Sequence, residues 1–261
     1  VSYDENVSKV SVVGVGMATQ AGVAQNMFRA LGEQGLNIQM ISTSEIKISV
    51  LVSREDSLEA LRTVHQTFAL DQQPEPAEGH PAQNAPVAAD RDAVEVAARM
   101  ERMEEMIIDD VTLDATQSRV TVVGVPDTPG LAAQVFDRVA KAKINVDMIV
   151  QSTEREGRSS ISFTVPRTDL KQAVKVSSDL CKELGCPAPT SAPEVAKLSI
   201  FGIGLRSHTG VAHRVFRCLA AAKINIEMIS TSEVRLNVVV NAAQGEKART
   251  TLEKEFADVR L

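Results

Sequence analysis

The stretch that decides the fold is KLSIFGIGLRSHTGVAHRVFRCLAAAKINIEMISTSEVRLNVVV, residues Lys197–Val240. It aligns without a gap with Lys9–Val52, KVSVVGVGMATQAGVAQNMFRALGEQGLNIQMISTSEIKISVLV, and nearly half of the aligned positions are identical. A third copy, Arg119–Pro166, begins RVTVVGVPDTPGLAAQVFDRVAKAKINVDMIVQSTE and has a turn that is two residues shorter. Repetition at this scale predicts repeated structural units. We therefore divide the chain into module A (residues 1–70), a connecting segment (71–108), module B (109–188) and module C (189–261).

The three modules share one order of apolar patterns. A β-branched strand and a glycine-containing turn precede an amphipathic helix, and an Asn-apolar-acid/amide-Met-Ile run then opens a second strand. A third strand and a second helix follow, so we predict α+β modules of the ferredoxin-like βαββαβ type. The expected first strands are Val10–Val15, Val120–Val125 and Leu198–Ile203, the third strands Ile46–Val52, Ser160–Val165 and Val234–Val240, and the second helices Asp56–Phe68, Asp169–Leu184 and Glu246–Phe256.

The connecting segment has two parts. Residues Asp71–Ala89 are rich in Pro, Ala, Gln and Glu, which predicts an extended linker. Residues Asp90–Ile108 carry apolar side chains at helical spacing, which predicts a connecting helix. In the alignment of A with C, Val1 corresponds to Pro189, immediately after module B. We therefore expect one more B-type module upstream in a longer polypeptide.

Composition excludes several classes of partner. Aromatic residues make up 3% of the chain and the net charge is −6, so neither stacking platforms nor a basic footprint for nucleic acid is present. An acidic chain with no long apolar run is also not expected to bind a membrane. Three cysteines, an odd number in a chain of 261 residues, favour the reducing cytoplasm.

Motifs for nucleotides and metals are incomplete. Gly14-Val15-Gly16 follows a strand, but Gly22 is displaced from the third position of a dinucleotide fingerprint. None of the three cysteines has a histidine at the spacing of a zinc site; they are Cys181, Cys186 and Cys218. No pair of carboxylates stands out for acid–base catalysis. We therefore predict no metal, no cofactor and no catalytic residue in this chain.

The turn before each first helix is the strongest candidate for binding. A glycine (Gly22, Gly130 or Gly210) opens each helix, and the free N–H groups of a first turn suit a carboxylate. In module B, Asp127 could meet an ammonium group, and we expect Asn145–Asp147 of the same module to face that turn. A free amino acid requires this combination. A capped helix beside a surface turn is the alternative interpretation.

The repeats resemble a known family. KVSVVGVGM, NIQMISTSEIKISVLV, VTVVGVPDTPG and INVDMIVQS look like the tandem ACT domains at the C-terminal end of bacterial aspartokinases. The resemblance implies modules that pair side by side and bind effector amino acids at their interface. It implies these effector-binding residues: in module B Asp127, Thr128, Gly130, Leu131, Ala132, Asn145, Val146, Asp147 and Gln151; in module C Gly210, Val211, Ala212, Asn225, Ile226, Ser232 and Glu233; and in module A Gly22, Val23, Ala24, Asn37, Ile38, Ser44 and Glu45.

The resemblance also implies a function. The chain would be the allosteric region of an aspartokinase, binding lysine and/or threonine for feedback inhibition of aspartate phosphorylation and self-associating through its modules. The kinase domain is absent from this chain, and ATP and magnesium would belong to it. The alternative is a free-standing ACT-repeat sensor that acts on a separate partner protein.

Overall fold

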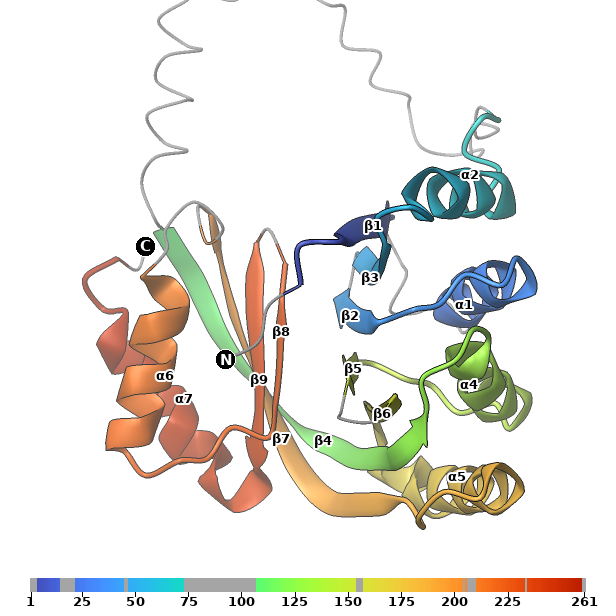
Figure 1. Ribbon diagram of the computed structural model, residues 1–261. Coiled ribbons are helices and arrows are strands. Elements are labelled where there is room, and N and C mark those ends of the chain that lie inside the picture. Colours follow the sequence, from blue (N-terminus) through green and yellow to red (C-terminus); the bar gives the residue numbers. More distant parts are fainter. Residues whose placement is uncertain are drawn as a thin grey trace, which may run out of the picture.

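The computed structural model describes residues 4–14, 22–44, 47–72, 107–153, 157–203, 205, 210–232 and 234–259. In this part of the chain one curled sheet has the strand order β1-β3-β2-β5-β6-β4-β7-β9-β8, with the helices on its outer face (Figure 1). The strands are β1 (Val7–Val13), β2 (Met40–Ser44), β3 (Lys47–Ser53), β4 (Ile107–Pro126), β5 (Ile149–Thr153), β6 (Arg158–Pro166), β7 (Thr190–Ile203), β8 (Met228–Thr231) and β9 (Arg235–Asn241). The helices are α1 (Val23–Glu33), α2 (Ser57–Thr67), α4 (Leu131–Lys141), α5 (Leu170–Leu184), α6 (Val211–Ala221) and α7 (Gly245–Glu255).

The order of elements confirms three α+β modules. Module A contains β1, α1, β2, β3 and α2, and the same series recurs in modules B and C. The second strands begin later than predicted, because Asn37–Gln39, Asn145–Asp147 and Asn225–Glu227 have no regular secondary structure. Each segment makes one strand-like bond, from its third residue to the third strand of its own module, as in Asp147 N–H to the Thr164 carbonyl at 3.1 Å. These residues therefore lead into the second strand without belonging to it.

Modules B and C exchange strands. The first strands of both modules are longer than predicted, because each crosses from one module to the other. The N-terminal half of β4 pairs with β7 beside module C, and the C-terminal half pairs with β6 in module B. Register shifts between Asp114 and Arg119 bend β4 where it changes module. The N-terminal half of β7 closes the sheet of module B after α5, whereas β4 supplies the fourth strand of module C.

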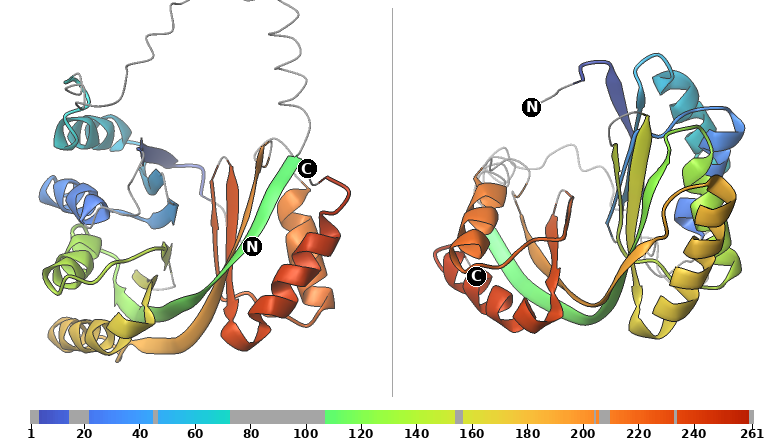
Figure 2. Two further views of the ribbon diagram at one scale, coloured as in Figure 1. Left: turned by 180° about the vertical axis from the view of Figure 1, so that it is seen from behind. Right: turned by 60° about the horizontal axis from the view of Figure 1, so that its bottom comes forward.

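Modules A and B pair side by side. Their sheets join where β2 and β5 align, with Ile41 opposite Gln151 and Ser42 opposite Val150. The helices α2, α1, α4 and α5 form one row over the joined sheets (Figure 2, left). One apolar core fills the space between this row and the sheet, while module C has a core of its own. A small cluster containing Met148 and Met228 lies between the two units.

The connecting segment differs from the prediction at its end. Ile107 and Ile108 begin β4, so the expected helix Asp90–Ile108 cannot extend to Ile108. The rest of that helix and nearly all of the expected linker lie outside the described residues. No helix in the described part of the chain is both long and apolar enough to cross a membrane.

Candidate functional site

The turn before each first helix leaves the helix without a side-chain cap. Gly22 and Gly130 hold positive φ angles of 94° and 81°, a region that glycine adopts without strain, whereas Gly210 has φ −85°. Because glycine has no side chain, no hydroxyl or carboxylate at this position caps the first-turn N–H groups. These groups and the positive end of the helix dipole can therefore receive an anion.

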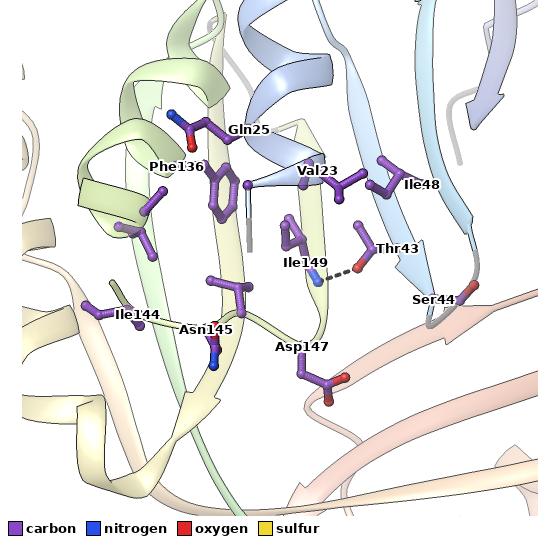
Figure 3. A pocket seen from close by; sticks show the side chains of 15 residues that line it. Val23, Gln25, Thr43, Ser44, Ile48, Phe136, Ile144, Asn145, Asp147 and Ile149 are labelled. Carbon is purple, nitrogen blue, oxygen red and sulfur yellow. Dashed lines mark hydrogen bonds between the residues drawn. The ribbon is translucent and has the colours of Figure 1, made fainter. Parts of the chain in front are cut away.

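The first pocket, here called the A-turn pocket, opens at the start of α1. Its floor is apolar and its rim carries hydroxyl, amide and carboxylate groups (Figure 3). Thr43 lies inside it, where its hydroxyl accepts a hydrogen bond from the Ile149 N–H at 2.8 Å. The pocket is lined by Gly22, Val23, Ala24, Gln25, Thr43, Ser44, Ile48, Phe136, Val139, Ala140, Ile144, Asn145, Val146, Asp147 and Ile149.

The second pocket, here called the B-turn pocket, opens at the start of α4. Asn37 of module A donates a hydrogen bond at 3.2 Å to the Oδ1 atom of Asp127, which lines this pocket. The Gln151 amide donates to the Ile38 carbonyl at 2.9 Å, but the Oε1 atom of Gln151 is buried and has no hydrogen-bond partner in the structure. The pocket is lined by Phe28, Ile38, Asp127, Thr128, Gly130, Leu131, Ala132, Ala133 and Gln151.

The two pockets are built reciprocally across the interface between modules A and B. The sequence analysis placed Asn145–Asp147 opposite the turn of their own module. The structure instead places them at the pocket that begins with Gly22 of module A. The turn of module B meets Ile38 and Asn37 of module A. Side-by-side pairing brings each turn to the neighbouring module, which within-module spacing could not show.

Residues proposed for module C do not join these pockets. Gly210, Val211, Ala212, Asn225, Ile226 and Ser232 are absent from both linings. Ser232 instead shapes its hairpin, accepting a hydrogen bond from the Arg235 N–H at 3.1 Å. Glu45 and Glu233 lie outside the described residues, so their predicted roles stay predictions.

Asp147 already has a cationic partner. Its Oδ2 atom lies 2.5 Å from the Lys197 ammonium of module C, and both side chains are largely buried. In the equivalent ion pair, module B supplies the base and module C the acid: Arg119 lies 3.3 Å from Glu227. Two ion pairs thus cross between modules B and C where the strands exchange.

The sequence analysis missed residues from all three modules. Gln25, Thr43 and Phe136 line the A-turn pocket, and Lys197 contacts Asp147 behind it. A signal for Thr43 was present, because the repeats align it with Gln151. A signal for Lys197 was also present: a basic residue precedes the predicted first strand of each module, and modules B and C carry an acid at the third position of the asparagine run.

Cys181 and Cys186 lie at the C-terminal end of α5. The Cys186 N–H donates to the Cys181 carbonyl at 3.0 Å where α5 ends. Burial, with a smaller contribution from Cys186, raises the pKa of the Cys181 thiol to about 12, so this thiol stays protonated. Among the described residues, no cluster of histidine, cysteine or acidic side chains is arranged to hold a metal ion.

The fold and the paired turns define a class of protein. The model of the ACT domain matches residues 10–68, 120–179 and 198–256, which together make up more than half of the chain. The chain therefore belongs to the ACT-domain family. Within that family, it is a regulatory part of aspartokinase, as the following comparisons show.

Three relatives define this correspondence. An aspartate kinase of Stutzerimonas stutzeri is 39% identical over 156 residues, covering 60% of this chain and 38% of the relative. The structure of aspartate kinase from Synechocystis superposes with a TM-score of 0.80 at 32% identity, covering 97% of this chain and 40% of that one. The regulatory subunit of aspartate kinase from Thermus thermophilus has 36% identity and a TM-score of 0.53, covering 57% of this chain and 98% of that one. The chain thus spans well under half of the complete kinases that it matches.

Proposed function

We propose that this chain is the effector-binding region of an aspartokinase and that lysine and/or threonine bind in the A-turn and B-turn pockets. Binding would favour an inhibited arrangement of the modules and so reduce phosphorylation of aspartate by the kinase domain. ATP and magnesium serve that domain, and an enzyme that uses ATP in biosynthesis belongs in the cytoplasm. A coupling free energy of about 1–3 kcal/mol is typical of such regulation.

The observation that carries this proposal is the buried, unpartnered Oε1 atom of Gln151 in the B-turn pocket. Gln151 is 4% exposed, and a buried polar atom without a partner costs about 1–3 kcal/mol. An effector ammonium would satisfy this atom and Asp127 together. The N–H groups at the start of α4 would receive the effector carboxylate. The pocket therefore offers partners to both ends of a free amino acid.

The first test is calorimetric titration of the chain with lysine, threonine and the other amino acids. Saturable heat is expected with lysine or threonine. Asp127→Asn should weaken binding about tenfold or more, since a hydrogen bond to a charged group contributes about 1.5–3 kcal/mol. Asp179→Asn, an exposed acid on α5 paired with Lys182, is the matched control and should leave affinity unchanged. Absence of heat with both lysine and threonine would refute the proposal.

A free-standing sensor is the second candidate. Both candidates require the same pockets, so binding alone does not separate them. A kinase-coding region upstream in the same reading frame supports the regulatory region of one enzyme, and its absence supports the separate sensor.

We also propose that the chain self-associates through module C. Phe28 and Phe136 occupy equivalent positions on α1 and α4 and are buried where modules A and B pair. Their counterpart on α6, Phe216, is 37% exposed, and Ile229 on the neighbouring strand β8 is 38% exposed. Module C therefore presents the face that the other two modules bury, and a further ACT module is the partner that fits it.

We expect Phe216→Lys to reduce self-association, because a charge on this face would lose its hydration in a module pair. Sedimentation velocity over a range of concentrations measures the change. Lys171→Glu, an exposed site on α5, is a control for a change of surface charge. Equal assembly of the wild type and Phe216→Lys would remove this face from the interface.

A further inference from the structure

Asp147 lies in the wall shared by two neighbouring pockets. On one side it lines the A-turn pocket, together with Asn145 and Val146. On the other side the same three residues line a second hollow, here called the Lys197 hollow, with Asp114, Gln117, Pro166 and Lys197. In Figure 3 the Asp147 carboxylate points away from Phe136 and Val23. The only carboxylate lining the described part of the A-turn pocket is thus turned towards a cation behind the wall.

Lys197 is held between two carboxylates. It lies 2.5 Å from Asp147, and it is opposite Asp114 in the ladder of β4 and β7. Burial alone would raise the pKa of Asp114, but hydrogen bonds from Thr116 and Gln117, with the charge of Lys197, hold it below its usual value. Asp114 is therefore charged at neutral pH. With a side chain only 12% exposed, Lys197 has little alternative contact with water.

The B-turn pocket lacks this arrangement. Its acid, Asp127, accepts a hydrogen bond from the neutral amide of Asn37, and no cation pairs with it in the described part of the chain. The charge of Asp147 is compensated by Lys197, whereas the partner of Asp127 is a neutral amide. The A-turn and B-turn pockets, which derive from repeated sequences, therefore differ in the charge that they present to a ligand.

We propose that Lys197, contributed by module C, determines the charge of the effector that the A-turn pocket accepts. With Lys197 in place, the charge of Asp147 is already compensated, so the A-turn pocket offers no net negative charge to a second cation. The pocket therefore accepts an amino acid with an uncharged side chain and disfavours a cationic one. This inference rests on the proposed function, because it assigns specificity to one of the two effector pockets.

The test compares threonine with lysine in an Asp127→Asn background, which weakens the B-turn pocket. Lys197→Met in that background leaves Asp147 uncompensated and should raise the affinity for lysine about tenfold. The affinity for threonine should change less than about threefold. Calorimetric titration gives both values. Adding Asp147→Asn to Lys197→Met should abolish the gain, because it removes the charge that attracts the second cation.

Arg119→Met is the matched control. Arg119 is the equivalent residue in module B, pairs with Glu227 and is absent from the wall of the A-turn pocket. It should leave the ratio of lysine to threonine affinity unchanged. If Lys197→Met does not fold, Lys197→Gln, which keeps a hydrogen-bond donor for Asp147, should shift the ratio in the same direction.

The outcomes separate the two proposals. If the Asp127→Asn chain binds threonine but neither Lys197 variant changes the preference, the role of Lys197 is wrong and the proposed function stands. An equal shift in Arg119→Met also refutes it, because the effect would then follow from general charge. If neither lysine nor threonine binds the unsubstituted chain, both proposals fail.

Discussion

Replacing Phe136 by alanine should lower the free energy of unfolding of the paired A–B unit by about 3–5 kcal/mol, the usual cost of removing a buried phenyl ring. Phe136 is 4% exposed and connects two rings. Its centroid lies 5.5 Å from that of Phe28 in module A and 5.6 Å from that of Phe163 in the sheet of module B. The substitution would therefore open a cavity between the two modules and beside the A-turn pocket.

The control is Phe216→Ala at the equivalent position of module C. That side chain is 37% exposed, so its loss should cost less than about 1 kcal/mol. Urea denaturation gives the stabilities, and hydrogen exchange shows which module opens. Protection should fall in α1 and α4 while α7 keeps its protection, because module C has a separate core. Equal losses of stability for the two variants would contradict the arrangement of modules A and B.

Gly32→Ala is expected to destabilise the same unit by about 1–3 kcal/mol, although alanine within a helix is normally the more stable residue. A Cβ atom at Gly32 would lie 2.6 Å from the Cα atom of Gly130. The atoms that this Cβ would meet belong to the backbone of Gly130, so a side-chain rotation cannot relieve the contact. The helices α1 and α4 would have to separate, and Gly130 would move relative to the B-turn pocket that it lines.

Two measurements check this expectation. The midpoint of urea denaturation should fall, and the affinity for threonine or lysine should fall with it. Gly210→Ala is the control, because Gly210 has φ −85° and a Cβ atom there meets nothing within 4 Å. We expect that variant to lie within about 0.5 kcal/mol of wild type. A more stable Gly32→Ala variant would show that α1 and α4 are not in this close contact.

Much of the site was predictable because its parts are local. The turns at Gly22 and Gly130 and the acid Asp127 follow from a strand, a glycine and an amphipathic helix in succession. The resemblance to ACT domains added Gln151, which lies in the B-turn pocket. The strand halves that cross between modules were not predictable in this way, because an apolar run does not show which sheet it enters.

The sequence by itself determined the number of modules, their order of elements and the residues at each helix start. Short-range periodicity and backbone conformation decide these features, and three copies of one pattern repeat the same information. Only the tertiary structure decided that the turn of one module meets the asparagine segment of the other, and that Lys197 reaches Asp147. Those contacts depend on how the sheets join at β2 and β5 and how β4 bends between modules. Both follow from packing between surfaces whose residues are far apart in the chain, so the periodicity within one module does not predict them.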